Sequence, residues 1–440
     1  MTVHRRDTLV LASTATGKTL VYAASGVLLG GIILVVEPLN SLIRDQVRRF
    51  KEWELPVLAW NGDVSKPEKA EIRTQIRAGR WGFFFTTPES LSAKSLRDLL
   101  QGKVKLAVID EAHTALRDRG FRAQYGRLGF MLDYLEPQVR LVCTATCPSP
   151  DRQELIRVLG LRQPSIVTAS TMRKNIGIRI VERSHGALAR ILNSHAGTSG
   201  LIFVSTIRTA TALCSALRVA GRNAGIFHGQ LPPAQKISIQ DAFMANKLPI
   251  VVATDAFLLG IDKADIRFCV HYDPPKSVED WVQGVGRCGR DGKESHAYGC
   301  FGVGAAEGFD ARRYLIRSSF PAVEDLRKVW EWIRNSSEGY CDYPPAKIAK
   351  IVLGERAKHS AQPIISILQQ NVLIEVTPLQ NGQLRHAAFG DFGDFPLDRY
   401  EAEKVDAFAR LTKLREVCSL PDAEIPGAID KYFEGAESNP

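Results

Sequence analysis

The chain has 440 residues, of which 45% are apolar and 24% charged, the proportions of a globular protein large enough for several domains. The most apolar run, residues 21–36, is too short to cross a bilayer, and residues 1–7 lack the apolar core of a secretion signal. Eight cysteines are scattered without a C-x-x-C pair, which predicts reduced thiols in an intracellular protein. We therefore expect no membrane segment.

Charge is distributed unevenly along the chain, whose net charge is +9. Residues 1–305 carry 40 Lys and Arg against 27 Asp and Glu, whereas residues 306–440 carry 17 against 21. A basic front part indicates a polyanionic partner, with nucleic acid favoured. A basic surface that is simply solvated is the alternative.

Short apolar runs separated by longer helical stretches predict an α/β architecture for the first two thirds of the chain. The expected buried strands are residues 8–11, 32–36, 82–86, 106–109 and 140–143, and then residues 200–204, 224–227, 249–254 and 267–271. We expect two tandem lobes, residues 1–170 and 171–305, each a parallel sheet with helices on both faces. Residues 174–183 are the expected crossing between them.

The character of the sequence changes after residue 305. Helices are expected over residues 312–335, 346–353 and 363–370, followed by strands over residues 372–376 and 384–389. Asn381-Gly382 suits the two-residue turn of a hairpin, because both positions need positive φ. Residues 306–440 are therefore expected to form a small, mainly helical region compatible with a winged-helix-like module. The last thirty residues are expected to be only partly ordered.

Residues 11–19, LASTATGKT, follow the first expected strand and precede an expected helix, the setting of a phosphate-binding loop. Backbone amides of such a loop point at a polyphosphate, while Lys18 reaches its β- and γ-phosphates and Thr19 holds Mg²⁺. The usual first glycine is replaced by Ala12, so a plain turn opening a helix is the alternative. The predicted nucleotide contacts are Ala12, Ser13, Thr14, Ala15, Thr16, Gly17, Lys18 and Thr19.

Residues 105–113, KLAVIDEAH, predict a strand that delivers two carboxylates to its carboxyl end, where doubly wound sheets bind ligands. Asp110 is expected to position Mg²⁺, and Glu111 to deprotonate the water that attacks the γ-phosphate. The alternative is a solvated acidic turn.

Residues 283–292, QGVGRCGRDG, place Arg287 and Arg290 three residues apart at what we expect to be the start of a helix. From the second lobe they are expected to stabilise charge that develops on the γ-phosphate. An Arg/Gly-rich surface turn is the alternative.

Taken together, the motifs resemble those of superfamily 2 helicases, and most closely the RecQ family of DNA helicases. PLNSLIRDQ, FLLGIDKADIRFCVHYDPP and GRCGRDG favour RecQ over the RNA helicases that also carry DEAH. The matching stretches are residues 13–19, 37–47, 86–90, 110–113, 144–146, 200–210, 226–231, 251–275 and 283–292. The resemblance implies two RecA-like lobes that couple ATP hydrolysis, with Mg²⁺, to 3′–5′ movement on DNA.

The resemblance also implies roles for residues that composition and spacing do not single out. Gln283 joins the catalytic set, and His113, Gly260 and Asp262 join the nucleotide site. Thr144 and Thr146 couple nucleotide state to lobe movement. The implied nucleic-acid contacts are Ser41, Arg44, Thr87 and Glu89 in the first lobe and Ser205, Arg208, His228 and Gly229 in the second.

Several departures from the family are visible. Only eleven residues precede Ala12, so the adenine-contacting segment is missing, which implies a truncated chain or reduced adenine selectivity. The loop HTALRDRGFRAQY lacks its tryptophan, leaving Phe121, Arg122 and Tyr125 as stacking groups. Cys341 stands alone where four zinc ligands are needed, so no zinc is expected.

The leading interpretation is an ATP-dependent, RecQ-like 3′–5′ DNA helicase or translocase that binds single-stranded or partly duplex DNA. An RNA-dependent ATPase and a degenerate nucleic-acid-binding protein with little unwinding activity remain alternatives. Expected partners include DNA-repair or recombination proteins. The expected location is the nucleus, favoured, in a eukaryote or the cytoplasm in a prokaryote.

Overall fold

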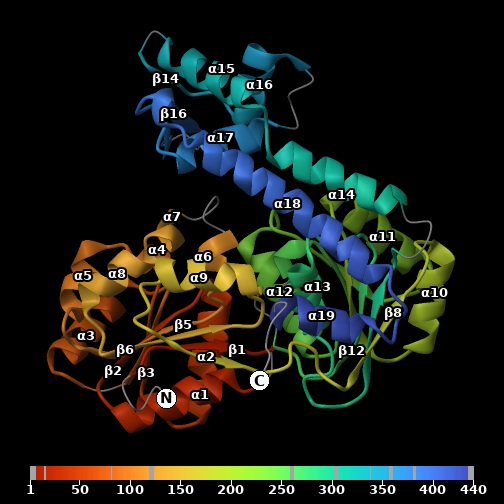
Figure 1. The fold of residues 1–440 in the computed structure, drawn as a ribbon, viewed down its shortest axis with the longest axis horizontal. Coiled ribbons are helices and arrows are strands. Elements are labelled where there is room, and N and C mark those ends of the chain that lie inside the picture. The colour runs from red at the N-terminus through yellow and green to blue at the C-terminus, as the bar shows by residue number, and fades with distance from the viewer. Residues whose placement is uncertain are drawn as a thin grey trace.

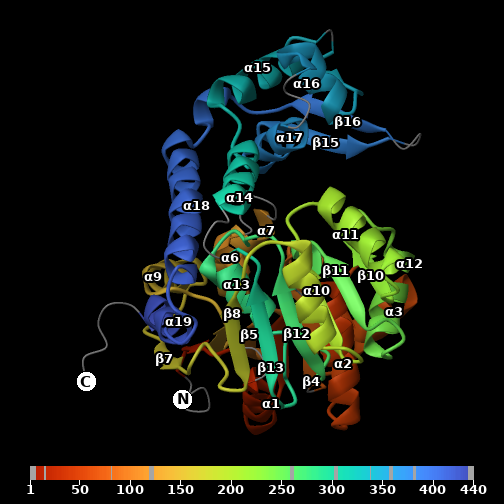
Figure 2. The same ribbon diagram turned by 90° about the vertical axis from the view of Figure 1, so that its right-hand side faces the viewer.

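The computed structural model describes residues 6–13, 16–80, 82–117, 123–257, 262–301, 306–336, 338–355, 360–379 and 383–434. Two α/β lobes lie side by side, and a smaller module is held above them by two long helices (Figures 1 and 2). The expected pair of parallel-sheet lobes with helices on both faces is thus confirmed.

The first lobe is built on a seven-stranded sheet in the order β3-β4-β2-β5-β6-β1-β7, and its paired strands are parallel. Apolar side chains on both faces are buried, as the continuous apolar runs predict. The strands are β1 (Thr8–Leu11), β2 (Ile32–Val36), β3 (Val57–Trp60), β4 (Gly82–Thr86), β5 (Val104–Ile109), β6 (Val139–Thr144) and β7 (Ser165–Thr168). The helices are α1 (Lys18–Leu29), α2 (Asn40–Glu52), α3 (Lys66–Arg77), α4 (Pro88–Leu91), α5 (Lys94–Leu100), α6 (Thr114–Arg117), α7 (Ala123–Gly126), α8 (Leu128–Leu135) and α9 (Ser149–Val158).

The second lobe repeats this plan with six strands in the order β10-β11-β9-β12-β13-β8. Its strands are β8 (Ile176–Ile180), β9 (Ser199–Phe203), β10 (Ala224–Phe227), β11 (Ile250–Ala253), β12 (Ile266–His271) and β13 (Ser295–Gly299). Its helices are α10 (His185–Ser194), α11 (Ile207–Val219), α12 (Pro233–Met244) and α13 (Val278–Val285). The expectation that residues 174–183 only cross between lobes is wrong, because they contain the edge strand β8.

The small module has the expected order of two helices followed by a hairpin. Helix α15 (Val323–Arg334) precedes β14 (Tyr340–Cys341), α16 (Pro345–Leu353), α17 (Ala361–Gln370), β15 (Ile374–Pro378) and β16 (Leu384–Ala388). The antiparallel sheet has the order β14-β16-β15, as in a winged helix. The expected helix over 312–335 is interrupted near Pro321, which separates α14 (Ala306–Ser319) from α15. Asn381 and Gly382 lie outside the described residues.

The C-terminal segment returns from the small module to the lobes. Helix α18 (Leu397–Cys418) runs down beside α14, and α19 (Ile425–Glu434) lies against the lobes (Figure 2). The expectation of partial order after residue 410 is wrong for residues 411–434, because Ile425, Ile429 and Phe433 recur every four residues and are buried in the second lobe's core.

Arg410 on α18 forms ion pairs with both lobes. Its guanidinium lies 3.0 and 3.1 Å from the carboxylate oxygens of Asp151 in α9, and it also pairs with Glu279 in α13, whose side chain is fully buried. Arg410→Met removes the countercharge of a buried carboxylate, so we expect the free energy of unfolding to fall by about 3 kcal/mol. Urea unfolding followed by tryptophan fluorescence measures this loss.

Arg399 on the same helix provides the matched control. It pairs with Glu403 at 2.8 Å, but both side chains are about half exposed. Arg399→Met should therefore cost less than about 1 kcal/mol. Equal losses for the two variants would contradict the structural role of Arg410.

Two further expectations, reduced thiols and no membrane segment, concern the whole chain. All eight cysteines are buried and unbridged. Among the described residues, no helix is long and apolar enough to cross a membrane.

Candidate nucleotide and nucleic-acid site

The phosphate-binding loop lies between β1 and α1. Gly17, at the N-terminus of α1, has a φ of 88°, a conformation that disfavours side chains with a Cβ. Lys18 follows it and donates from Nζ to the carbonyl oxygens of Ala12 and Ser13 at 3.0 and 3.5 Å. Thr16 donates to the Ser13 carbonyl at 2.6 Å. Thr14 and Ala15 lie outside the described residues.

Asp110 and Glu111 lie at the carboxyl end of β5, next to the phosphate-binding loop. Glu111 has a φ of 46° and donates its amide to the Asp110 carboxylate at 2.8 Å. Burial, and then the charge of Glu111, raises the pKa of Asp110 to about 6, against an opposing effect of Lys18. Burial alone would raise the pKa of Glu111, but Lys18, His113 and the two arginines of the second lobe lower it. Glu111 is therefore held in its ionised form.

Arg287 and Arg290 enter this site from the second lobe. The expectation that they begin a helix is wrong, because α13 ends at Val285 and both arginines lie in the turn that follows. Gly289 in this turn has a φ of 53°, and a Cβ there would lie 2.6 Å from Asn175. Burial, and then the charge of Arg290, lowers the pKa of Arg287 to about 9, so Arg287 stays charged at neutral pH.

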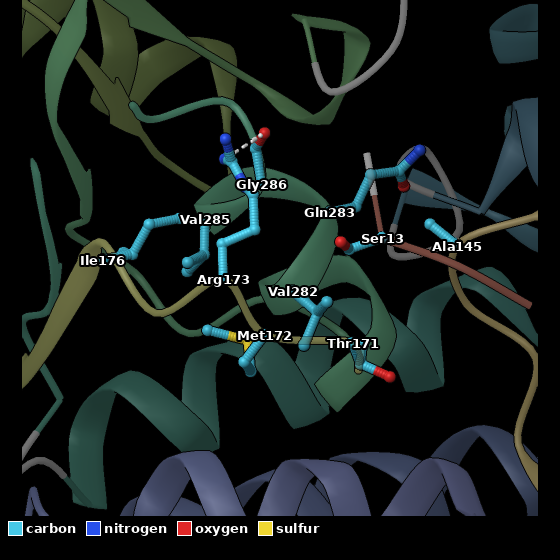
Figure 3. A pocket seen from close by; sticks show the side chains of 10 residues that line it. All are labelled: Ser13, Ala145, Thr171, Met172, Arg173, Ile176, Val282, Gln283, Val285 and Gly286. Carbon is cyan, nitrogen blue, oxygen red and sulfur yellow. Dashed lines mark hydrogen bonds between the residues drawn. The ribbon is translucent and has the colours of Figure 1, made fainter. Parts of the chain in front are cut away.

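Gln283, on α13, reaches the same region from the second lobe. Figure 3 shows its side chain close to Ser13 and Ala145 of the first lobe, in a small pocket lined by both lobes. Ser13 Oγ and Gln283 Nε2 are buried, and neither has a hydrogen-bond partner among the residues that the structure describes. Buried polar atoms without partners are costly, so these two atoms are suited to bind a polar group placed between them.

The residues present fit a nucleoside triphosphate with a divalent cation. A lysine and a positive-φ glycine open α1, and the Thr19 hydroxyl and Asp110 carboxylate are hard oxygen donors. Among the described residues, no cluster of three or more His, Cys, Asp or Glu side chains can hold a metal. A cation bound by one or two protein oxygens together with phosphates requires no such cluster.

The residues implied to couple nucleotide state to movement lie together beside Glu111. His113 Nδ1 lies 2.9 Å from Thr144 Oγ1 and 3.6 Å from Glu111 Oε2. Thr144 Oγ1 also accepts the amide of Thr146 at 3.3 Å. His113 thus lies between Glu111 and Thr144, the last residue of β6.

The residues implied to contact nucleic acid follow strands in the half of each sheet that does not carry the nucleotide residues. Ser41 lies in α2 after β2, whereas Thr87 caps α4 after β4. In the second lobe, Ser205 and His228 follow β9 and β10. The remaining ones, Arg44, Glu89, Arg208 and Gly229, are all exposed. The structure thus separates these residues from the nucleotide residues after β1, β5 and β6.

The proposed stacking role of Tyr125 is wrong in this structure. Its side chain is only 2% exposed and packs in the core of the first lobe, so it cannot stack on a base. Phe121, Arg122 and Gly260 lie outside the described residues.

Sequence reasoning missed three residues at the site. Glu37 follows β2, and burial and the charges of Asp110 and Glu111 raise its pKa well above the usual range. Arg173 donates to the carbonyls of Gly286 and Gly289 at 3.0 and 2.9 Å. These hydrogen bonds stabilise the turn that carries Arg287 and Arg290. Arg49, on α2, pairs with Asp262 of the second lobe. Only Glu37 carried a signal, since it ends a strand as Asp110 does.

Comparison with known proteins identifies the class. Residues 1–155 match the DEAD/DEAH box helicase domain, and residues 184–292 match the helicase conserved C-terminal domain. The chain therefore contains the two domains for which these family models stand.

Within this class, its relatives confirm the RecQ resemblance. The ATP-dependent DNA helicase RecQ of Pasteurella multocida is 31% identical over 66% of this chain and 46% of its own length. That of Synechocystis is 33% identical over 65% of this chain and 63% of its own length. The chain spans less than two thirds of either relative.

Solved structures share the fold. Dbp5 of S. cerevisiae bound to RNA and ADP BeF3 matches with a TM-score of 0.54 and 21% identity, over 67% of this chain and 78% of its own. The DUF1998 helicase MrfA bound to DNA matches with a TM-score of 0.56 and 19% identity, over 88% of this chain and 56% of its own.

Proposed function

We propose that the chain is an ATP-dependent DNA helicase or translocase that moves 3′–5′ along single-stranded DNA. The observation that carries this proposal is the convergence on Glu111 of Lys18 from its own lobe and of Arg287 and Arg290 from the other. Because the charges that keep Glu111 ionised come from both lobes, hydrolysis depends on how the lobes are arranged. Such dependence is what a motor requires.

In this proposal each lobe supplies part of the chemistry. Lys18 binds the β- and γ-phosphates, and Thr19 and Asp110 hold Mg²⁺, which neutralises phosphate charge when bound. Glu111 takes the proton of the attacking water. Arg287 and Arg290, supported by Gln283, stabilise the charge that develops as the phosphate leaves.

We propose that the residues after β2, β4, β9 and β10 contact the DNA backbone. Hydroxyls and amides such as those of Ser41 and Ser205 can hold phosphates without reading bases, as movement along any sequence demands. The Thr87 hydroxyl is buried and bonded to Ser90, so it is not available for this contact. The exposed Arg44 and Arg208 would make this binding salt-sensitive.

We also propose a division into residues 1–170, 171–305 and 306–440, the first two forming the motor. Repair or recombination proteins are the proposed partners. The proposed location is the nucleus in a eukaryote or the cytoplasm in a prokaryote.

Strand displacement on tailed duplexes tests the proposed activity and polarity. The full chain should displace a strand from a DNA duplex with a 3′ single-stranded tail, but not from blunt or 5′-tailed duplexes, and Lys18→Ala should be inactive. Displacement only from 5′-tailed DNA would contradict the polarity. Displacement that requires an RNA tail would contradict the substrate class.

A further inference from the structure

Asp262 is shared by two guanidinium groups that come from opposite lobes. Arg290, in the turn after α13, lies 2.5 Å from Asp262 Oδ1. Arg49, in the last turns of α2 in the first lobe, pairs with Oδ2 of the same carboxylate. Burial alone would raise the pKa of Asp262, but Arg290 and Arg49 outweigh it and lower the pKa. Three charged groups thus form one bridge between the lobes.

The bridge restrains Arg290, which the proposed function needs at the γ-phosphate. Arg290 is 11% exposed in its ion pair with Asp262. To act on the γ-phosphate, its guanidinium must leave this largely buried ion pair and form another with the phosphate. A carboxylate left without a countercharge would oppose that exchange. Arg49 pairs with the other carboxylate oxygen, Oδ2, so Asp262 would keep one countercharge if Arg290 left.

We propose that Arg49 is a positioning residue that holds Asp262 from the opposite lobe and thereby releases Arg290 to the nucleotide. This inference rests on the proposed function. In this proposal, the contact of Arg49 with Asp262 both connects the two lobes and favours hydrolysis. Because Arg49 and Asp262 are about one-third exposed, the bridge can open and close with solvent access.

The neighbouring Arg48 offers a matched control. It lies on the same helix and carries the same charge, but it pairs within the helix with Asp45 at 3.4 Å and Glu52 at 3.9 Å. Arg48→Gln and Arg49→Gln therefore change the charge of α2 equally. Only Arg49→Gln removes the contact with the second lobe.

Steady-state hydrolysis at saturating single-stranded DNA tests whether Arg49 affects hydrolysis through Asp262. We expect Arg49→Gln to lower kcat about 3- to 10-fold with little change in the KM for ATP, and Arg49→Lys to restore part of the loss. In an Asp262→Asn background, Arg49→Gln should have no further effect, because the shared carboxylate is gone. Equal kcat for Arg48→Gln and Arg49→Gln, or an undiminished effect in Asp262→Asn, would overturn the inference.

A second readout does not depend on hydrolysis. All eight native cysteines are buried, so cysteines introduced at the exposed positions Ala70 and Ser215 can be labelled to measure the distance between lobes. Arg49→Gln should broaden the distance distribution without nucleotide, and Arg48→Gln should not. An unchanged distance distribution would overturn the inference that Arg49 connects the two lobes. Absence of DNA-stimulated hydrolysis in the unmodified chain would instead overturn the proposed function.

Discussion

Glu111→Gln is expected to lower ATP hydrolysis at least about 100-fold, the contribution typical of a general base. Glu111 lies in the sharp turn after β5 and is kept ionised by Lys18, His113 and the arginines of the second lobe. Glutamine has nearly the same shape but cannot take a proton. Single-turnover hydrolysis measures the effect, and DNA binding by fluorescence anisotropy should be unchanged.

Glu136→Gln is the matched control for this substitution. Glu136 is also a first-lobe glutamate with positive φ (53°), but it is exposed at the C-terminus of α8. Its replacement should leave hydrolysis intact. A Glu111→Gln variant that hydrolyses ATP as fast as Glu136→Gln would show that another group activates the water.

Arg290→Ala is expected to lower kcat about 1000-fold, as loss of an arginine finger does in related phosphoryl transfer. The side chain now pairs with Asp262, and the charge of Arg290 also reaches Glu111 across the lobes. Its charge acts mainly in the transition state, so ATP binding should change little. Comparison of kcat with the dissociation constant of a non-hydrolysable ATP analogue separates the two.

Lys293→Ala, at the exposed end of the same turn, is the control for Arg290→Ala. It removes a positive charge without approaching Glu111. If both variants lose hydrolysis equally, general electrostatics of the turn is responsible. If Arg290→Ala weakens analogue binding as much as it lowers kcat, Arg290 acts in binding and not in the chemical step.

Most strands with continuous apolar runs, such as β2 and β5, could be predicted, but β3 and β7 were not expected. β8 and β13 were missed because Arg179, Ser295 and His296 interrupt their apolar pattern, although both strands pair in the second sheet. The partly polar α19 was misjudged for a different reason. Its apolar residues are spaced for a helix, but only contact with the second lobe makes that helix stable.

The site could be predicted where chemistry is concentrated in short motifs. Lys18, Asp110 and Glu111 each follow a strand, and parallel strands bring their carboxyl ends to one edge. The pairing of Arg49 with Asp262 joins residues 213 apart in sequence, in different lobes, and no local pattern indicates it. Tyr125 shows the converse, since a side chain in a plausible motif is placed in the core.

The central claim is that nucleic acid drives ATP hydrolysis in this chain. Steady-state hydrolysis with single-stranded DNA, with RNA of the same sequence and without nucleic acid tests it most directly, with Glu111→Gln as the blank. We predict strong stimulation by DNA that Glu111→Gln abolishes. DNA binding accompanied by hydrolysis no higher than the blank would contradict the claim and leave a nucleic-acid-binding protein without a motor.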